Sequence, residues 1–507
     1  MALHGHTKIE LLDVKTGDVE VIEKDNLVTN YLHDAMQPNL LFSMNNALGY
    51  RYYSHNLWPS YGRTISSFFK GIVCTSNVKE ENANKYFADG SDLIVAHSGR
   101  GVSNSDLTSG TFNSLLSSVN ENSATFVWDW DAEHGNGTIS SVCLAPVSYG
   151  HIGNGGAYVA GTDKPEGIAM FSGDGFVLYT ESNKSGRTTG VPLYMSMKNN
   201  KFVCLNYFTN ADKKIGFNEI YVPASAYDPY KITEDYVFGN KYGWNGSQNV
   251  TMSYNTIKEI DLSSVITANN NYFMMFIHKN DFYFGTHSAN SLAANSTIKM
   301  AHIDLDTMQL VGSVDIKNTT TAAWPLNLDP VSALQKLGST QTLNSVDRRI
   351  YCDGEYIILP SNTNNKMCKV KISNSADTTI VDSNVGWQYV GQHFGRLFIG
   401  NGNVSMYDKT DNTIKASGAN GYVPILSRGA NLNNVATCYT YKSIASDSEL
   451  YSFIYDMNSG NYGRAAEFRV YPIQNPFAYS TINTLDAPVT KTADKTMRIT
   501  YTLTRGE

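Results

Sequence analysis

Three acidic residues within the first 150 positions have the residue types and spacing of a cation site. Asp129, Asp131 and Glu133 alternate with two tryptophans, so a carboxylate follows at every second position. A calcium-binding loop that began at Asp129 would need glycine at its sixth position and glutamate at its twelfth, where His134 and Ser140 stand instead. The loop pattern fails, and the alternation instead predicts a strand whose carboxylates share one solvent-exposed face.

Histidines and nucleophile motifs give no stronger signal for chemistry. His4 and His6 could bind a transition metal if several chains met on an axis, but a polar N-terminal segment is the simpler interpretation. No Gly-x-Ser-x-Gly elbow, phosphate loop or His-Glu-x-x-His motif occurs. We therefore predict no catalytic residue, no metal, no cofactor and no enzymatic activity. A glycosidase needs only two carboxylates that the fold brings together, so a polysaccharide depolymerase stays open as an alternative.

Tyrosine is the residue type that indicates binding. The chain has 32 tyrosines, many of them beside Asn, Ser or Gly. A tyrosine or tryptophan ring can lie on the apolar face of a sugar while polar neighbours bind the hydroxyls. The candidate ligand contacts are Tyr207, Tyr221, Tyr227, Tyr230, Tyr236, Tyr242, Trp244 and Tyr254. The alternative is that these rings cover strand surfaces and assembly contacts.

The composition predicts an all-β protein. At 507 residues the chain has the length of roughly two to four domains. Only 17% of its residues are charged, and its abundant Tyr, Thr, Asn and Gly suit short strands and polar turns. A net charge of −7 without a basic run argues against a nucleic-acid partner. No apolar stretch approaches the ~20 residues of a membrane span, and the N-terminus has no apolar core of the length that a signal peptide needs, so we expect synthesis in the cytoplasm.

The six cysteines are widely scattered and include no Cys-x-x-Cys pair. This spacing fits neither a zinc site nor a redox motif. We expect them to be buried as small hydrophobic residues. They are Cys74, Cys143, Cys204, Cys352, Cys368 and Cys438.

The N-terminal region is expected to be rich in strands. Residues 7–12 and 19–23 predict a hairpin whose turn contains Gly17, and Asn26 has the residue type of a cap for a following helix. Further strands are expected at 126–131 and 138–144. A glycine-rich connection follows after residue 150.

Two weakly periodic series follow this connection. In one, an aspartate ends an apolar strand, at Asp261, Asp304, Asp408 and Asp456. In the other, a strand follows a two-residue turn, and the four turns are Asn199–Asn200, Asn280–Asp281, Asp353–Gly354 and Phe394–Gly395. Four-stranded units at a spacing of about 40 to 50 residues are typical of β-propeller blades, of which this region would hold roughly five to seven. A series of β-sandwiches is the alternative.

The last segment predicts a half-buried strand. Met497, Ile499, Tyr501 and Leu503 alternate with polar residues, so they need an apolar partner surface, which we expect in the N-terminal unit around Trp128. The predicted organisation is a β-propeller-like region inserted into a β-rich, sandwich-like anchoring domain built from both termini. Its parts are an anchoring domain (residues 1–150), the propeller-like domain (165–478) and a C-terminal strand that completes the anchoring domain (480–507).

Three parts of the sequence resemble structural proteins of tailed bacteriophages of Firmicutes, of the tail-fibre, baseplate or receptor-binding type. They are HTKIELLDVKTG (residues 6–17) with DNLVTN (25–30), WDW (128–130) with GNGTISS (135–141), and VTKTADKTM (489–497). All three lie outside the propeller-like region. The resemblance implies a virion-anchoring module and no catalytic residues.

These observations together predict a non-enzymatic virion protein of the tail or baseplate that displays a propeller for host-surface glycan recognition. Its expected partners are other virion proteins, a host-surface glycan and further copies of itself, without insertion into a membrane. A capsid decoration or head-fibre protein is the alternative, and a tail-associated depolymerase is the second.

Overall fold

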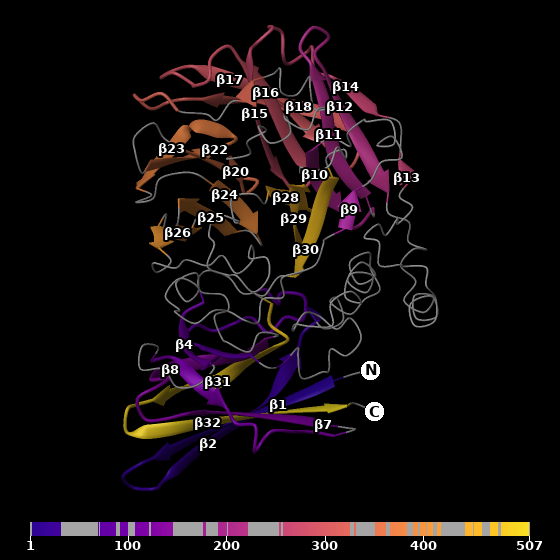
Figure 1. Ribbon diagram of the computed structural model, residues 1–507. Helices are drawn as coiled ribbons and strands as arrows, with labels where there is room; N and C mark the ends of the chain where they lie inside the picture. The colour runs from indigo at the N-terminus through magenta and orange to yellow at the C-terminus, as the bar shows by residue number, and fades with distance from the viewer. Residues whose placement is uncertain are drawn as a thin grey trace. The chain divides into compact units, whose positions relative to one another are not determined.

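The computed structural model is all-β, which confirms the expected fold class (Figure 1). It describes residues 3–31, 69, 71–87, 92–99, 107–120, 123–145, 176–178, 191–199, 201–221, 253–254, 257–324, 329–330, 350–360, 366–382, 389–393, 396–401, 403–408, 413–416, 442–449, 451–458, 467–474 and 478–505. The chain divides into two compact units. We call them the barrel unit (Met1–Gln37, Trp58–Ala169 and Asn475–Glu507) and the inserted unit (Pro38–Leu57 and Met170–Gln474). The glycine-rich connection expected after residue 150 lies outside the described residues.

The barrel unit is one ten-stranded sheet that returns on itself. Its order is β32-β1-β2-β31-β8-β3-β4-β5-β7-β6, and β32 also pairs with β7, so nine strands form a closed ring of pairings. The strands are β1 (Leu3–Asp13), β2 (Val19–Val28), β3 (Gly71–Thr75), β4 (Ile94–Gly99), β5 (Ser109–Phe112), β6 (Ser118–Val119), β7 (Ser123–Trp130), β8 (Gly137–Ala145), β31 (Thr481–Lys491) and β32 (Lys495–Arg505).

β1 and β2 form the hairpin that the sequence predicts. In its turn, Asp13 Oδ1 accepts hydrogen bonds from the amides of Lys15 and Thr16 at 2.8 and 2.9 Å. Gly17 adopts a φ of 79°, a conformation that glycine adopts without a Cβ clash. The helix cap predicted at Asn26 is wrong, because that residue pairs with β1 and the strand continues beyond it.

The terminal strand β32 lies between β1 and β7 in the sheet. Ile499 stands opposite Trp128 on one side and Ile9 on the other, and Tyr501 stands opposite Phe126. All five side chains are buried. Since burying an aliphatic or aromatic side chain contributes roughly 1.5–3 kcal/mol, the apolar positions of β32 hold the strand in its register.

The inserted unit is built from antiparallel sheets. The first contains β10 (Val191–Ser196), β11 (Lys201–Thr209), β12 (Lys214–Tyr221) and β13 (Ser253–Tyr254), with β14 (Lys258–Asp261) also paired to β12. The second contains β15 (Tyr272–His278), β16 (Asp281–His287), β17 (Thr297–Asp304) and β18 (Gln309–Lys317), with β19 (Asp329–Pro330) paired to β15.

The remaining sheets follow the same plan. The third contains β20 (Tyr351–Cys352), β21 (Tyr356–Pro360), β22 (Lys366–Lys371) and β23 (Asn374–Asp382). The fourth contains β24 (Tyr389–His393), β25 (Arg396–Asn401), β26 (Asn403–Asp408) and β27 (Thr413–Ala416). The last contains β28 (Lys442–Ser446), β29 (Tyr451–Asn458), β30 (Glu467–Gln474) and β9 (Phe176–Leu178).

The first and last parts of the inserted unit are joined by strand pairing. β9, its first strand, pairs antiparallel with β30, its last. β10 pairs parallel with β28, where Tyr194 stands opposite Ala445. Strands from both ends of the inserted unit therefore share one hydrogen-bonded sheet.

The periodic turns of the sequence are largely confirmed. β11 and β25 begin directly after two of the predicted turns, at Lys201 and Arg396. β16 begins at Asp281, inside a predicted turn, and β21 begins at Tyr356, one residue later than expected. Three of the four aspartates end strands, at Asp261, Asp304 and Asp408. The fourth prediction is wrong: Asp456 lies inside β29, opposite Arg469 of β30, because the strand continues to Asn458.

Neighbouring sheets of the inserted unit pack face to face. The second and third sheets share a core of Met274, Phe276, Tyr283, Leu292, Ile298, Met300, Ile316, Trp324, Cys352, Ile357, Leu359, Cys368, Val370 and Ile372. Five of the cysteines are buried and unbridged, as predicted, and Cys438 lies outside the described residues. In the described part of the chain, no helix has the length and apolar character needed to cross a membrane.

Candidate functional site

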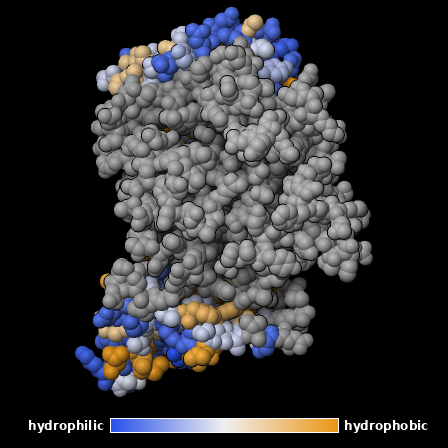
Figure 2. Space-filling view, in the orientation of Figure 1, coloured by the Kyte–Doolittle hydropathy of each residue, from blue (hydrophilic) through white to orange (hydrophobic). Residues whose placement is uncertain are grey.

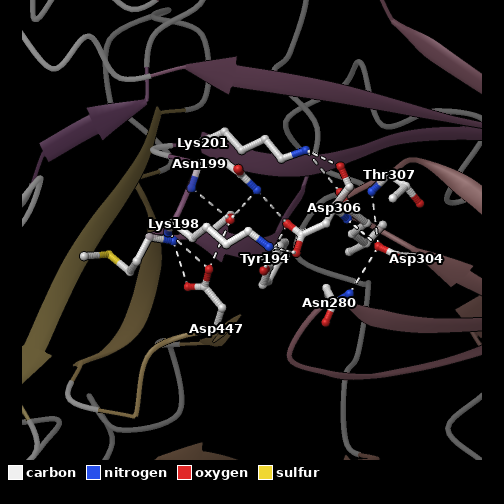
Figure 3. Close-up of polar contacts among 12 residues, drawn as sticks. Tyr194, Lys198, Asn199, Lys201, Asn280, Asp304, Asp306, Thr307 and Asp447 are labelled. Carbon is white, nitrogen blue, oxygen red and sulfur yellow. Dashed lines mark hydrogen bonds and ion pairs between the residues drawn. The ribbon is translucent and has the colours of Figure 1, made fainter.

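A group of polar contacts in the described part of the inserted unit lies where turns of three sheets meet. In an antiparallel sheet of four strands, the first and third turns lie at the same end. The turns after β10, β15, β17 and β28 thereby bring together Tyr194, Lys198, Asn199, Lys201, Asn280, Asp304, Asp306, Thr307 and Asp447 (Figure 3). We call these nine residues the turn cluster.

Asp447, which follows β28, binds the turn of the first sheet. Its carboxylate accepts hydrogen bonds from the Met197 amide at 2.7 Å, the Lys198 amide at 3.2 Å and Ser196 Oγ at 3.1 Å. A carboxylate that receives backbone amides in this way fixes the conformation of the turn it binds. The contact adds a side-chain link where β10 and β28 already pair.

Asp306 connects the turn after β17 to the same place. Its Oδ1 accepts hydrogen bonds from Asn199 Nδ2 at 3.1 Å and from the Tyr194 hydroxyl at 3.3 Å. The Lys198 ammonium lies 3.9 Å from its other carboxylate oxygen. Lys198 is 73% exposed and so offers a cation to the solvent. Side chains of the first sheet therefore meet around a carboxylate of the second.

Asp304 organises the turn in which Asp306 stands. Its Oδ1 accepts hydrogen bonds from the Asp306 amide at 2.7 Å, the Thr307 amide at 3.2 Å and Asn280 Nδ2 at 3.1 Å. Burial raises the pKa of Asp304, but these hydrogen bonds outweigh it and leave the pKa below its ordinary value. The side chain stays ionised and acts as a fixed acceptor.

Lys201 of the turn cluster also forms a buried ion pair. Lys201 Nζ is 2.7 Å from Glu219 Oε1, and both side chains are buried. The same ammonium donates to the carbonyls of Leu305 at 3.3 Å and Asp306 at 3.0 Å, and Lys258 lies 3.5 Å from the other carboxylate oxygen of Glu219. Burying two charges is costly, and the two carbonyls that accept from Lys201, together with the second lysine beside Glu219, offset part of that cost.

The second sheet also carries a histidine and carboxylate pair. His302 Nε2 lies 2.7 Å from Asp281 Oδ1, and the imidazole stacks on Tyr283 with the ring centroids 4.5 Å apart. Each partner is thereby oriented. These contacts link the neighbouring strands β16 and β17 on one face of the second sheet.

The predicted tyrosine contacts are only partly described. The Tyr207 ring covers Gly216 on the neighbouring strand, and its hydroxyl donates a hydrogen bond to Glu259. Burial and then that carboxylate raise the pKa of Tyr207 to about 12. Tyr221 and Tyr254 lie in the paired strands β12 and β13, one register position apart. Outside the described residues lie Tyr227, Tyr230, Tyr236, Tyr242 and Trp244.

The acidic residues that resembled a cation site are engaged with protein groups. Asp129 binds Arg498 Nε and Asn113 Nδ2, each at 2.7 Å. Asp131 Oδ1 lies 2.7 Å from His134 Nδ1 and accepts the amide of the same residue. Among the described residues, no group of three or more side chains is arranged to ligate a metal.

The loop between β7 and β8 instead surrounds a cation from the chain itself. Lys491 of β31 is buried, and its ammonium donates to Asn136 Oδ1 at 2.8 Å and to the Ala132 carbonyl at 3.3 Å. Burial lowers its pKa to about 8. Lys491 carries no signal in the sequence, because it lies 355 residues from Asn136 and no local pattern marks it as the partner of this loop.

Comparisons with known proteins identify no family. No family model and no curated protein matches the chain. Among solved structures, it is similar to Kluyvelomyces marxianus Hsv2 (9% identity, TM-score 0.21, covering 53% of this chain and 62% of that one), so it spans less than two thirds of that protein. It is also similar to the β-propeller domain of the Trilobed protease from Pyrococcus furiosus (8% identity, TM-score 0.24, covering 72% and 95%). A third is an exo-β-1,3-galactanase from Phanerochaete chrysosporium (8% identity, TM-score 0.21, covering 86% and 100%). Likenesses at these TM-scores carry no argument about the fold or function of this chain.

Proposed function

We propose that the chain is a non-enzymatic structural protein of a bacteriophage virion, located in the tail or baseplate. In this proposal the barrel unit attaches the protein to the particle. The inserted unit is a β-propeller that contacts a glycan on the host surface.

One observation carries the proposal: the segments that resemble phage particle proteins are neighbours in one sheet. Residues 6–17 include most of β1, residues 135–141 begin β8, and residues 489–497 span the turn between β31 and β32. β1 pairs with β32, and β8 pairs with β31. Segments hundreds of residues apart thus belong to a single folded module, which is what an attachment domain requires.

The strand order supports the propeller. The second, third and fourth sheets each contain four sequential antiparallel strands, and β9 from the beginning of the unit is the outer strand beside β30. A propeller closes in this way, since a strand from one end of the chain completes a blade built from the other end. With the first and last groups of strands, which β10 and β28 join into one sheet, the described residues hold five such groups, within the number that the sequence spacing predicts.

The turn cluster favours binding over catalysis. The carboxylates of Asp304, Asp306 and Asp447 each accept two or more hydrogen bonds from neighbouring groups. A general acid must hold a proton near neutral pH, whereas burial raises the pKa of Asp304 and its hydrogen bonds outweigh that effect and leave the pKa below its ordinary value. The proposed glycan contacts are the tyrosines between residues 207 and 254, because their rings provide contact area at a low cost in conformational entropy.

The test is binding of the purified chain to host cell envelopes, with reducing sugar measured in the same samples. We expect binding without sugar release. Tyr242→Ala with Trp244→Ala should weaken binding at least tenfold, which corresponds to about 1.4 kcal/mol. Leu115→Ala is the matched control, because this side chain is 94% exposed and lies in the barrel unit.

Two outcomes would replace the proposal. Release of reducing sugar from host polysaccharide would indicate a depolymerase. Antibody labelling of virions, viewed by electron microscopy, should mark the tail. Label on the capsid, together with no binding to envelopes, would indicate a decoration or head-fibre protein.

A further inference from the structure

The outer edge of β2 is an open strand edge in the barrel unit. Among the described strands, residues 19–26 pair with β1 alone, and β2 meets β31 only at Leu27 and Val28. Beyond that point β31 is linked to β2 by a side chain, since Lys24 Nζ donates to the Thr484 carbonyl and to Asp486. An edge of this kind presents unpaired backbone donors and acceptors, which favour the addition of another strand.

Apolar side chains accompany this edge. Leu12, Val14, Val19 and Val21 are 40%, 54%, 53% and 48% exposed, and Leu12 stands directly opposite Val19. Figure 2 shows hydrophobic residues gathered at the end of the barrel unit where Figure 1 places the β1–β2 hairpin. Exposed apolar residues scattered singly need no explanation, but a group of four beside an open edge is typical of an interface.

We infer that β2 pairs antiparallel with β2 of a second copy of the chain, around a twofold axis at Ile22. A twofold axis that relates neighbouring antiparallel strands stands perpendicular to the sheet, so one residue must lie opposite its own copy. This inference concerns self-assembly and does not depend on the proposed virion function.

The charges along β2 select the residue at the axis. With Ile22 there, Glu20 stands opposite Lys24 of the partner subunit, and the symmetric pair repeats the contact. With Glu23 at the axis, two carboxylates would face each other, which destabilises a strand pair. With Val21 at the axis, Glu20 would face an isoleucine and gain no opposite charge.

Burial supports the same choice. Ile22 stands opposite Ile9, which is fully buried, yet Ile22 itself is only half-buried, and among the described strands it pairs with β1 alone. Pairing at this residue would place two isoleucines side by side on the inner face of a continuous sheet. The interface would be isologous, as in most homodimers.

Cysteine cross-linking tests the register. Directly opposed residues have Cβ atoms about 4.5–5.5 Å apart, close to disulfide geometry. Under mild oxidation, Ile22→Cys should therefore form a covalent dimer on non-reducing gels. Val21→Cys is the matched control: it is more exposed, but its own copy would lie two positions away. Efficient cross-linking of Val21→Cys in place of Ile22→Cys would overturn the assigned axis.

The oligomeric state and its charge dependence complete the test. Light scattering on the unmodified chain should give twice the monomer mass. Glu20→Lys should raise the dimer dissociation constant roughly tenfold or more, because it would place two lysines opposite each other across the interface. Glu20 also forms an intramolecular ion pair with Lys495 at 3.0 Å. Lys495→Ala removes that pair and should leave the dimer unchanged. A monomer at all concentrations, or a trimer, would overturn the inference.

Discussion

Gly5 of β1 lies against the ring of Tyr501 in β32, and a Cβ at position 5 would overlap the tyrosine hydroxyl. The ring carbon Cζ would stand 2.8 Å from that Cβ, closer than real Cβ contacts. β1 and β32 come from opposite ends of the chain, so this contact fixes how closely they approach.

We expect Gly5→Ala to destabilise the barrel unit by about 1–3 kcal/mol, because a methyl group would have to displace a buried ring. The measurement is the denaturant midpoint of the barrel transition. Tyr501→Phe removes the hydroxyl and should recover part of the loss in the double variant. Strictly additive effects of the two substitutions would show that the contact does not limit the packing.

Much of the fold could be predicted from the sequence, and the reason lies in local signals. The alternation in the terminal segment marks a strand, and the turns before Lys201 and Arg396 mark where strands begin. The helix cap predicted at Asn26 is wrong because only the residue type suits a cap, whereas pairing with Gly5 sets the conformation of Asn26. Tertiary pairing overrides local preference there.

The turn cluster could be predicted only in part. Asp304 and the turn before Lys201 belong to the periodic series, so their local conformations follow from the sequence. Asp447 has no such signal, and it binds a turn 250 residues earlier in the chain. Contacts of this kind depend on the order in which sheets meet, which no local pattern encodes.

Asp447 should hold the turn of the first sheet in place. Asp447→Ala removes three accepted hydrogen bonds, and we expect a loss of about 1–3 kcal/mol, since it leaves the Met197 and Lys198 amides without this acceptor. Hydrogen exchange at the Met197 amide should accelerate. Asp447→Asn is the control, because its amide oxygen can still accept; equal exchange rates in the two variants would contradict this role.

The stability of the inserted unit should depend strongly on both partners of the buried pair, Lys201 and Glu219. Lys201→Met leaves a buried carboxylate with less compensation, and we expect a loss of about 3–5 kcal/mol in the transition of the inserted unit. Lys201→Met with Glu219→Leu should be less destabilised than the single variant. Lys198→Met, at an exposed position, should change stability by less than about 0.5 kcal/mol.

Lys491 should make the stability of the barrel unit depend on pH. Burial lowers its pKa from the ordinary 10.5 to about 8, so the unfolded chain binds more protons between these values. The contribution of this group to the free energy of unfolding therefore rises as the pH increases from about 8 to 10.5. Lys491→Met should lack this rise in paired denaturation series. Parallel pH profiles for both proteins would contradict the assignment.

The position of the inserted unit within the barrel sheet determines the order in which the protein can form during synthesis. β9 and β30, which join the ends of the inserted unit, are both complete once residue 474 has been made, whereas β1 must wait for β32. At ribosomal rates of about 5–20 residues per second, β1 waits roughly 25 to 100 s for its partner. During that interval the edge of β1 that pairs with β32 has no partner strand, so the nascent N-terminus is where a chaperone would be needed.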